Sequence, residues 1–146
     1  MLAGAAITFA DNVRALELDE ALFAAGGYRS VLGVLKHMGG WTHVYRSYAF
    51  DMEPKHWNQT SWPRGLRDTV QPTREYLHEV IAWVVQGIDD WQAALADASD
   101  SLLDELRLLH WRATAPLWQI VLMTANHVVY DTGELNMLLS ISRQEA

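Results

Sequence analysis

The apolar residues of this chain recur at intervals of three and four far more often than they alternate with polar residues. That spacing is typical of amphipathic helices and leaves few candidate strands. The clearest run predicts a helix from Pro72, in a first-turn position, to about Ala98. Its apolar stripe comprises Leu77, Ile81, Val84, Ile88, Trp91 and Leu95. The chain is therefore expected to be all-α.

Further helices complete the predicted set. The first covers roughly residues 5–25 and ends at the glycines of the AAGGY sequence. The second begins near Ser30, a residue type favoured at helix N-caps, and runs to about Tyr48. The last opens around the TAPLW sequence and continues to about Ser142. A short helical turn is expected before it, within residues 102–109.

The connection over residues 51–71 is long for a compact bundle and contains two prolines and two tryptophans. It is expected either to cross over the bundle or to cover one end of it, while the short links elsewhere favour antiparallel neighbours. The sequence thus predicts one domain over residues 1–146, a four-helix bundle with a crossover between its second and third helices. In the second helix, Gly39 and Gly40 each cost roughly 1 kcal/mol relative to alanine, which indicates close helix packing or a bend.

Composition narrows the classes of function. The chain has 146 residues, half of them hydrophobic, which suits one domain with a sizeable core. A net charge of −7 and only two lysines disfavour nucleic-acid binding. The absence of cysteine excludes disulfides, thiolate metal ligands and a cysteine nucleophile. The apolar start makes a poor signal peptide and the uncharged stretch 113–130 is interrupted by polar residues, so a cytoplasmic protein without membrane spans is expected.

The last predicted helix carries polar residues on the face that should point inward. His127 and Asp131 are four residues apart and Glu134 is three further on, so at about 100° per residue they share one face. Buried polar groups are costly unless something satisfies them, and a His–Asp pair at this spacing can hold a metal ion. His37, which lies mid-helix on an apolar face, is the best third ligand.

Two imidazoles and one carboxylate would leave positions open for water or substrate at such a metal. Glu134 is expected to act as a fourth ligand, as a hydrogen-bond partner of a ligand, or as the proton acceptor in catalysis. The alternative is that His37 is an ordinary core residue and that His127 and Asp131 make only a local polar contact.

The other aromatic and imidazole side chains are weaker candidates. His43 is expected on another, solvated face, and His78 either at a boundary position or approaching the site. His56 and His110 are expected to be surface or packing residues. Three tryptophans at helical spacing are expected to be core or helix-contact residues: Trp83, Trp91 and Trp118. The remaining expectation is that Trp41 walls a pocket beside the metal, and that Trp57 and Trp62 either cap that pocket or simply pack.

Two segments resemble those of a known family. In YRSVLGVLKHMGGWTHVY a His precedes a small residue and an aromatic one, and ANHVVYDTGELNMLL is similar to a closing motif of the form His-x-x-x-His-x-Gly-Gln followed by aliphatic residues. Both resemble the DinB-like, or YfiT-like, superfamily of four-helix bundle metal-binding proteins, over nearly the whole chain. On this resemblance His37 and His127 match family ligands. Asp131 stands where a second His is common, Gly133 matches the motif glycine, and Glu134 stands where Gln is usual.

The resemblance implies an up-down-down-up bundle, a divalent metal ion and a homodimer. Zinc or nickel is the expected ion, and iron is an alternative because two His and one carboxylate are also the ligand types of iron oxygenases. The aspartate changes the charge and softness of the site, which leaves the identity of the metal open. Related proteins include thiol-dependent enzymes that use mycothiol or bacillithiol, such as maleylpyruvate isomerase and thiol S-transferases. A low-molecular-weight thiol cosubstrate is therefore one expectation, and DNA binding is not implied.

Three functions remain open at this point. The first is a metal-dependent enzyme acting on a small molecule, as a thiol-dependent transferase or isomerase, or as a hydrolase. The second is a non-catalytic ligand-binding or structural homodimer with a degenerate metal site. The third is an interaction module that docks partners on the tryptophan-rich connection over residues 51–71.

Overall fold

Three long helices make up most of the described chain, which comprises residues 9–64 and 71–145 of a computed structural model. They are α3 (Val31–Phe50), α4 (Arg74–Ala96) and α6 (Leu117–Glu145). The shorter elements are α2 (Leu18–Leu22), η1 (Trp57–Gln59), α5 (Asp100–Leu103), β1 (Leu106–Leu108) and β2 (Thr114–Pro116). The expected all-α class is therefore broadly confirmed, with one small hairpin added.

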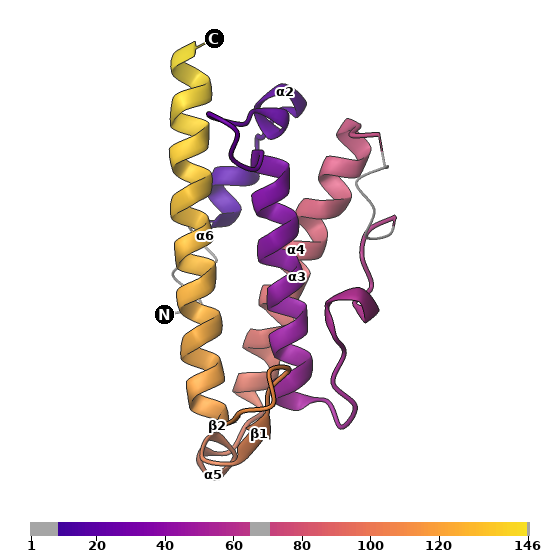
Figure 1. Ribbon diagram of the computed structural model, residues 1–146, viewed down its shortest axis with the longest axis vertical. Coiled ribbons are helices and arrows are strands. Elements are labelled where there is room, and N and C mark those ends of the chain that lie inside the picture. Colours follow the sequence, from indigo (N-terminus) through magenta and orange to yellow (C-terminus); the bar gives the residue numbers. More distant parts are fainter. Residues whose placement is uncertain (1–8, 65–70, 146) are drawn as a thin grey trace.

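Helices α3 and α4 run in the same direction, and α6 runs in the opposite one (Figure 1). Because parallel neighbours need a return connection, the chain after α3 passes back alongside these two helices before α4 begins (Figure 1). Helix α3 packs against both α4 and α6 and so lies between them. Only short helical pieces precede α3 within the described residues, so the full up-down-down-up four-helix bundle stays a prediction.

The predicted first helix over residues 5–25 is wrong where the structure describes it. Residues 9–13 are helical, residues 14–17 leave the helix, and α2 is a separate short helix; residues 5–8 lie outside the described residues. The Glu20 carboxylate accepts a hydrogen bond from the Glu17 backbone N–H at 3.0 Å, which caps a new helix start at that point. Val13 and Leu16 are still buried. The apolar pattern therefore identifies core positions there without ensuring a continuous helix.

The two helices that flank the long connection begin at polar caps. Ser30 Oγ accepts from the backbone N–H of Gly33 at 3.2 Å, so the predicted start of α3 is confirmed. Thr73 Oγ1 accepts from the backbone N–H of Tyr76 at 3.2 Å and caps α4. Pro72 therefore precedes the cap instead of occupying the first helical turn, which corrects the expectation for that residue.

The segment expected to form a short helical turn over residues 102–109 is mostly a hairpin. Helix α5 ends at Leu103, and β1 then pairs antiparallel with β2 in the register Leu106 with Pro116 and Leu108 with Thr114. Strands of three residues are too short to display alternation, so the sequence pattern does not separate them from a turn of helix. The hairpin leads directly into α6.

The adjacent glycines of α3 are explained by close packing. A Cβ atom on Gly39 would overlap the indole of Trp83 on α4. A Cβ atom on Gly40 would overlap the indoles of Trp57 and Trp62 from the long connection. These glycines lower the helix propensity of α3, but their lack of a side chain lets α4 and the tryptophan-rich connection pack closely against it.

The buried side chains form two apolar clusters along the helices. One is built mainly from the first half of α3, from α4 as far as Ile88, and from the second half of α6. The other lies nearer the hairpin and contains Tyr45, Trp91 and Ile120. In the predicted α4 stripe, Ile81 and Leu95 are half-buried and the other four side chains are buried. Within the described residues, no helix combines the length and apolarity that a membrane span requires.

Candidate metal centre

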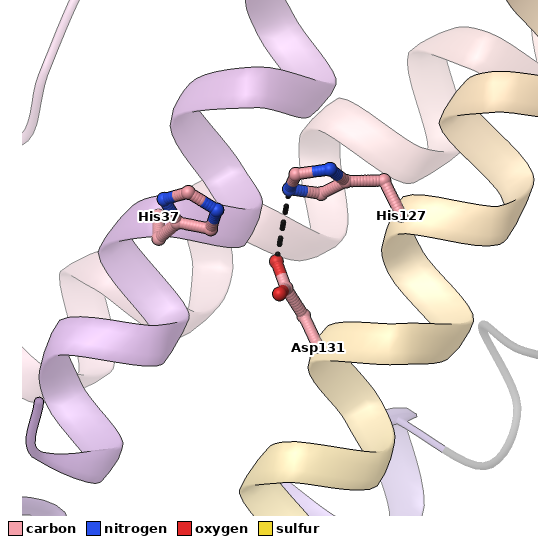
Figure 2. Close-up of side chains that lie close together, drawn as sticks. All are labelled: His37, His127 and Asp131. Carbon is pink, nitrogen blue, oxygen red and sulfur yellow. Dashed lines mark ion pairs between the residues drawn. The ribbon is translucent and has the colours of Figure 1, made fainter. Parts of the chain in front are cut away.

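Three of the predicted site residues come together between α3 and α6. His37 projects from α3, and His127 and Asp131 project from successive turns of α6 (Figure 2). One potential ligand atom from each residue lies within 4.8 Å of the other two. Ligands at about 2.1 Å from a shared ion lie at most about 4.2 Å apart, so this separation requires only a small side-chain rotation to meet one metal.

The two imidazoles are held by their helices in a stacked arrangement. The ring centroids of His37 and His127 are 5.0 Å apart, with 26° between the ring planes. Burial is the largest cause that lowers the pKa of His37, and the nearby charge of Asp131 opposes it. The neutral imidazole, which is the form that binds metals, is therefore favoured at His37.

The strongest feature of the cluster is its unsatisfied polar atoms. Nε2 of His127 and both carboxylate oxygens of Asp131 are buried without a hydrogen-bond partner, and the Asp131 side chain is 1% exposed. Nε2 of His127 lies 3.1 Å from Oδ2 of Asp131 (Figure 2), but the groups are not aligned as a hydrogen bond. A buried carboxylate without a hydrogen-bond partner is costly. The donor set of two imidazoles and one carboxylate suits a divalent cation, which would satisfy these atoms.

Glu134 does not join this group of potential ligands. Arg29, just before α3, donates from Nε and Nη2 to the two Glu134 oxygens at 2.9 and 2.5 Å. This hydrogen bonding is the main cause that holds the pKa of Glu134 below its usual range, which makes Glu134 a weaker proton acceptor. Nη2 of Arg29 also lies 3.5 Å from Oδ1 of Asp131, so Arg29 links Glu134 to the cluster.

Arg29 is the site residue that the sequence did not reveal. It precedes the N-cap of α3 and reaches a carboxylate 105 positions later in the chain. No periodicity applies to a residue outside a helix, and a long arginine side chain can point in many directions.

Tryptophans from α3 and from the long connection surround the His37 ring. The ring centroid of Trp41 lies 6.4 Å from that of His37, and the centroid of Trp57 lies 6.2 Å from it. Trp41 and Trp57 also contact each other, with centroids 5.0 Å apart. Trp62 instead packs on Trp57 and Trp83 and donates its Nε1–H to the carbonyl of Trp57 at 2.9 Å. Trp41 and Trp57 therefore stand beside the cluster, whereas Trp62 packs behind them.

The expectation that His43 is solvated is wrong. The His43 ring is half-buried and stacks on Trp83 at 4.7 Å between centroids, with Nε2 3.0 Å from the Trp83 carbonyl oxygen. Burial is the main cause that lowers the pKa of His43. The residue does turn to a face other than that of His37, but α4 covers that face.

The remaining histidines do not join the cluster. His78 and His56 are exposed, and His56 contacts the hydroxyl of Tyr48 at 3.0 Å. His110 is half-buried among aromatic rings, and burial lowers its pKa. Among the tryptophans expected in the core, Trp91 is buried and donates to the carbonyl of Thr42 at 2.9 Å. Trp118 is 45% exposed, so of its two expected roles, core or helix contact, the core position is wrong.

No family model matches this chain, and no curated protein matches it. The resemblance to DinB-like proteins therefore rests on the two segments described above. The geometry of the cluster is independent of that resemblance, because it follows from the positions of His37, His127 and Asp131 alone.

Proposed function

We propose that this protein binds one divalent metal ion through His37, His127 and Asp131 and uses it to act on a small molecule. The observation that carries the proposal is the convergence of three potential ligand atoms within 4.8 Å, among them buried atoms without a hydrogen-bond partner. Zinc or nickel suits the two nitrogen donors and one oxygen donor, and iron is the alternative.

The chain's own residues supply the surroundings of the ion. When bound, a divalent metal provides a Lewis acid that polarises a substrate or acidifies a bound water or thiol. Asp131 contributes the negative charge of the proposed ligand set. Nη2 of Arg29 lies 3.5 Å from Oδ1 of Asp131. Trp41 and Trp57 lie beside His37, with ring centroids 6.4 and 6.2 Å from that of the imidazole. Glu134, paired with Arg29, is positioned to act through Arg29 on Asp131 and is a poor candidate for the catalytic base.

The DinB-like resemblance supports the same reading and extends it. It places His37 and His127 at ligand positions, with Asp131 replacing a common second His. On that basis we propose an up-down-down-up four-helix bundle that forms a homodimer. The chemistry is that of a thiol-dependent transferase or isomerase, or of a hydrolase, with a low-molecular-weight thiol as cosubstrate in the first case.

One observation favours a second candidate, a non-catalytic ligand-binding or structural dimer with a degenerate site. Nε2 of His127 and Oδ2 of Asp131 are only 3.1 Å apart, so a protonated His127 could neutralise Asp131 without any metal. In that case the pair would serve as a local ion pair in the core. The two candidates differ in whether a metal ion stabilises the fold.

Metal binding is the deciding measurement. The full chain is purified without an affinity tag, its zinc, nickel and iron contents are measured, and zinc is titrated into chelator-treated protein by calorimetry. We expect one ion per chain and a rise in melting temperature on adding zinc, since a ligand that binds only the folded state stabilises it.

The variants His37→Ala, His127→Ala and Asp131→Asn should each abolish stoichiometric binding. His78→Ala is the matched control, because it removes an exposed imidazole from α4 outside the cluster. Absence of metal from the purified protein, together with a melting temperature that zinc leaves unchanged, would favour the non-catalytic candidate. Zinc binding that survives the cluster variants but is lost in His78→Ala would place the ion elsewhere.

A further inference from the structure

A groove of about 1010 Å³ opens between the residues that precede α3 and the outward side of α6. Much of its lining is apolar or aromatic, and several of these side chains are exposed: Tyr28, Val129, Tyr130 and Met137. Arg29 and Glu134 supply its charged lining. We propose that this groove binds a small amphipathic monoanion as the substrate or cosubstrate of the metal centre. Its apolar body lies along α6 and its anionic head lies at Arg29.

Arg29 connects the groove to the cluster. Its side chain lines the groove, and its Nη2 lies 3.5 Å from Oδ1 of Asp131. A head group at Arg29 is therefore separated from a proposed metal ligand by one guanidinium group. The inference rests on the proposed function, because the groove serves the chemistry only when the cluster holds a metal.

Charge determines the class of the head group. Arg29 carries one positive charge and faces two carboxylates, those of Glu134 and Asp131. These three charged side chains sum to one negative unit, which repels an anion from the metal-free site. A divalent ion at the cluster reverses the net charge to one positive unit. The groove should thus prefer an anion only in the metal-loaded protein, by a factor of about five or more for charges several ångströms apart in water.

Gly133 keeps part of the groove open. It is an exposed residue in the middle of α6, it lines the groove, and a Cβ atom placed on it would meet no atom within 4 Å. Glycine inside a helix is destabilising relative to alanine, and no packing contact among the described residues requires it here. Gly39 differs, since α4 packs where its side chain would be. Space for a ligand gives a physical reason for glycine at position 133.

The probe for this proposal is 8-anilinonaphthalene-1-sulfonate, which has an aromatic body and a single negative charge. Its fluorescence is titrated with the zinc-loaded chain and with the chelator-treated chain. We expect saturable binding at one site per chain that is at least about fivefold tighter with zinc. The uncharged analogue N-phenyl-1-naphthylamine should show no such preference.

Gly133→Leu should abolish the saturable binding, because the added side chain enters the groove from a position where a Cβ atom meets no atom within 4 Å. Gln119→Leu is the matched control, since it adds the same side chain at an exposed position of α6 outside the groove. Both variants should bind zinc as the unmodified chain does, which separates loss of the groove from loss of the metal centre.

The outcomes distinguish this inference from the proposed function. If zinc binds but the sulfonate binds equally with and without it, or binds Gly133→Leu unchanged, the groove proposal is overturned while the metal proposal stands. If zinc does not bind, the metal proposal itself fails. If the zinc-loaded chain is a dimer, and Tyr130→Glu gives a monomer that binds the sulfonate where the dimer does not, the groove belongs to a second copy and the proposal is overturned.

Discussion

Arg29→Ala tests the charge arrangement around the proposed metal centre. Arg29 donates two hydrogen bonds to Glu134, at 2.9 and 2.5 Å, and lies 3.5 Å from Asp131. The side chains of Glu134 and Asp131 are only 17% and 1% exposed. Removal of the guanidinium therefore leaves two poorly hydrated carboxylates without a cation, and the folded state should lose stability.

The size of the loss follows from burial. Removal of one partner from a fully buried ion pair costs about 3–5 kcal/mol, whereas an exposed pair contributes about 0–1 kcal/mol. The Arg29 side chain is 33% exposed, which lies between these limits. After allowance for solvent screening, metal-free Arg29→Ala should lose about 1–3 kcal/mol of unfolding free energy. With saturating zinc the loss should be smaller, because a cation bound at Asp131 replaces part of the missing charge.

The assay is urea unfolding followed by tryptophan fluorescence at pH 7, once with a chelator and once with zinc. Arg64→Ala is the matched control: Arg64 donates to Glu79 at 2.8 and 2.5 Å, but both side chains are nearly half exposed. That control should leave the unfolding free energy unchanged within error. Equal losses for Arg29→Ala and Arg64→Ala, or a loss from Arg29→Ala that zinc does not reduce, would refute the reasoning.

Other predictions follow from the same structure. Gly133→Ala should raise the unfolding free energy by about 1 kcal/mol in urea titrations through helix propensity, whereas Gly39→Ala should lower it because its Cβ overlaps Trp83. Ser30→Ala should lower it by about 1 kcal/mol, since the cap of α3 is lost; a Ser30→Ala variant as stable as the unmodified chain would deny that role to the hydroxyl. The pKa of Glu134 is lowered in the folded state, so its contribution to stability is present above the ordinary value of 4.5 and lost as pH falls through the lowered pKa. Glu134→Gln should therefore be less stable than the unmodified chain at pH 7, and the difference should vanish in acid unfolding curves.

The long helices could be predicted because their apolar stripes extend over many turns. The α4 stripe from Leu77 to Trp91 and the cap at Ser30 both correspond to observed features. The short elements were not predicted, for the opposite reason. The break before Glu17 and the three-residue strands β1 and β2 each depend on a few local hydrogen bonds. A pattern that needs two turns to become visible cannot resolve elements of that size.

The sequence predicted which helix faces carry the site residues, but not every side chain that contacts them. The spacing of His127, Asp131 and Glu134 places them on one face of α6, and that face does meet α3 at His37. Spacing along α6 does not predict which position of that face a side chain from another element will meet. Arg29 lies outside α3 and donates a hydrogen bond to Glu134, the carboxylate nearest in sequence to the cluster. No helical pattern predicts this contact. His43 shows the same limit, since its face was assigned correctly but Trp83 covers it.

This distribution of charge bears on why two carboxylates occur so close together in the interior. Arg29 donates two hydrogen bonds to Glu134 but only approaches a single oxygen of Asp131, at 3.5 Å, without a hydrogen bond. Asp131 is then the buried anion in excess, and the groups nearest to it include two imidazoles that can each offer a lone pair. A proton on His127 would neutralise Asp131 but would leave His37 without a role in the cluster. A divalent cation would use the carboxylate and both imidazoles at once, which is why we propose a metal ion here instead of an ion pair between His127 and Asp131 alone.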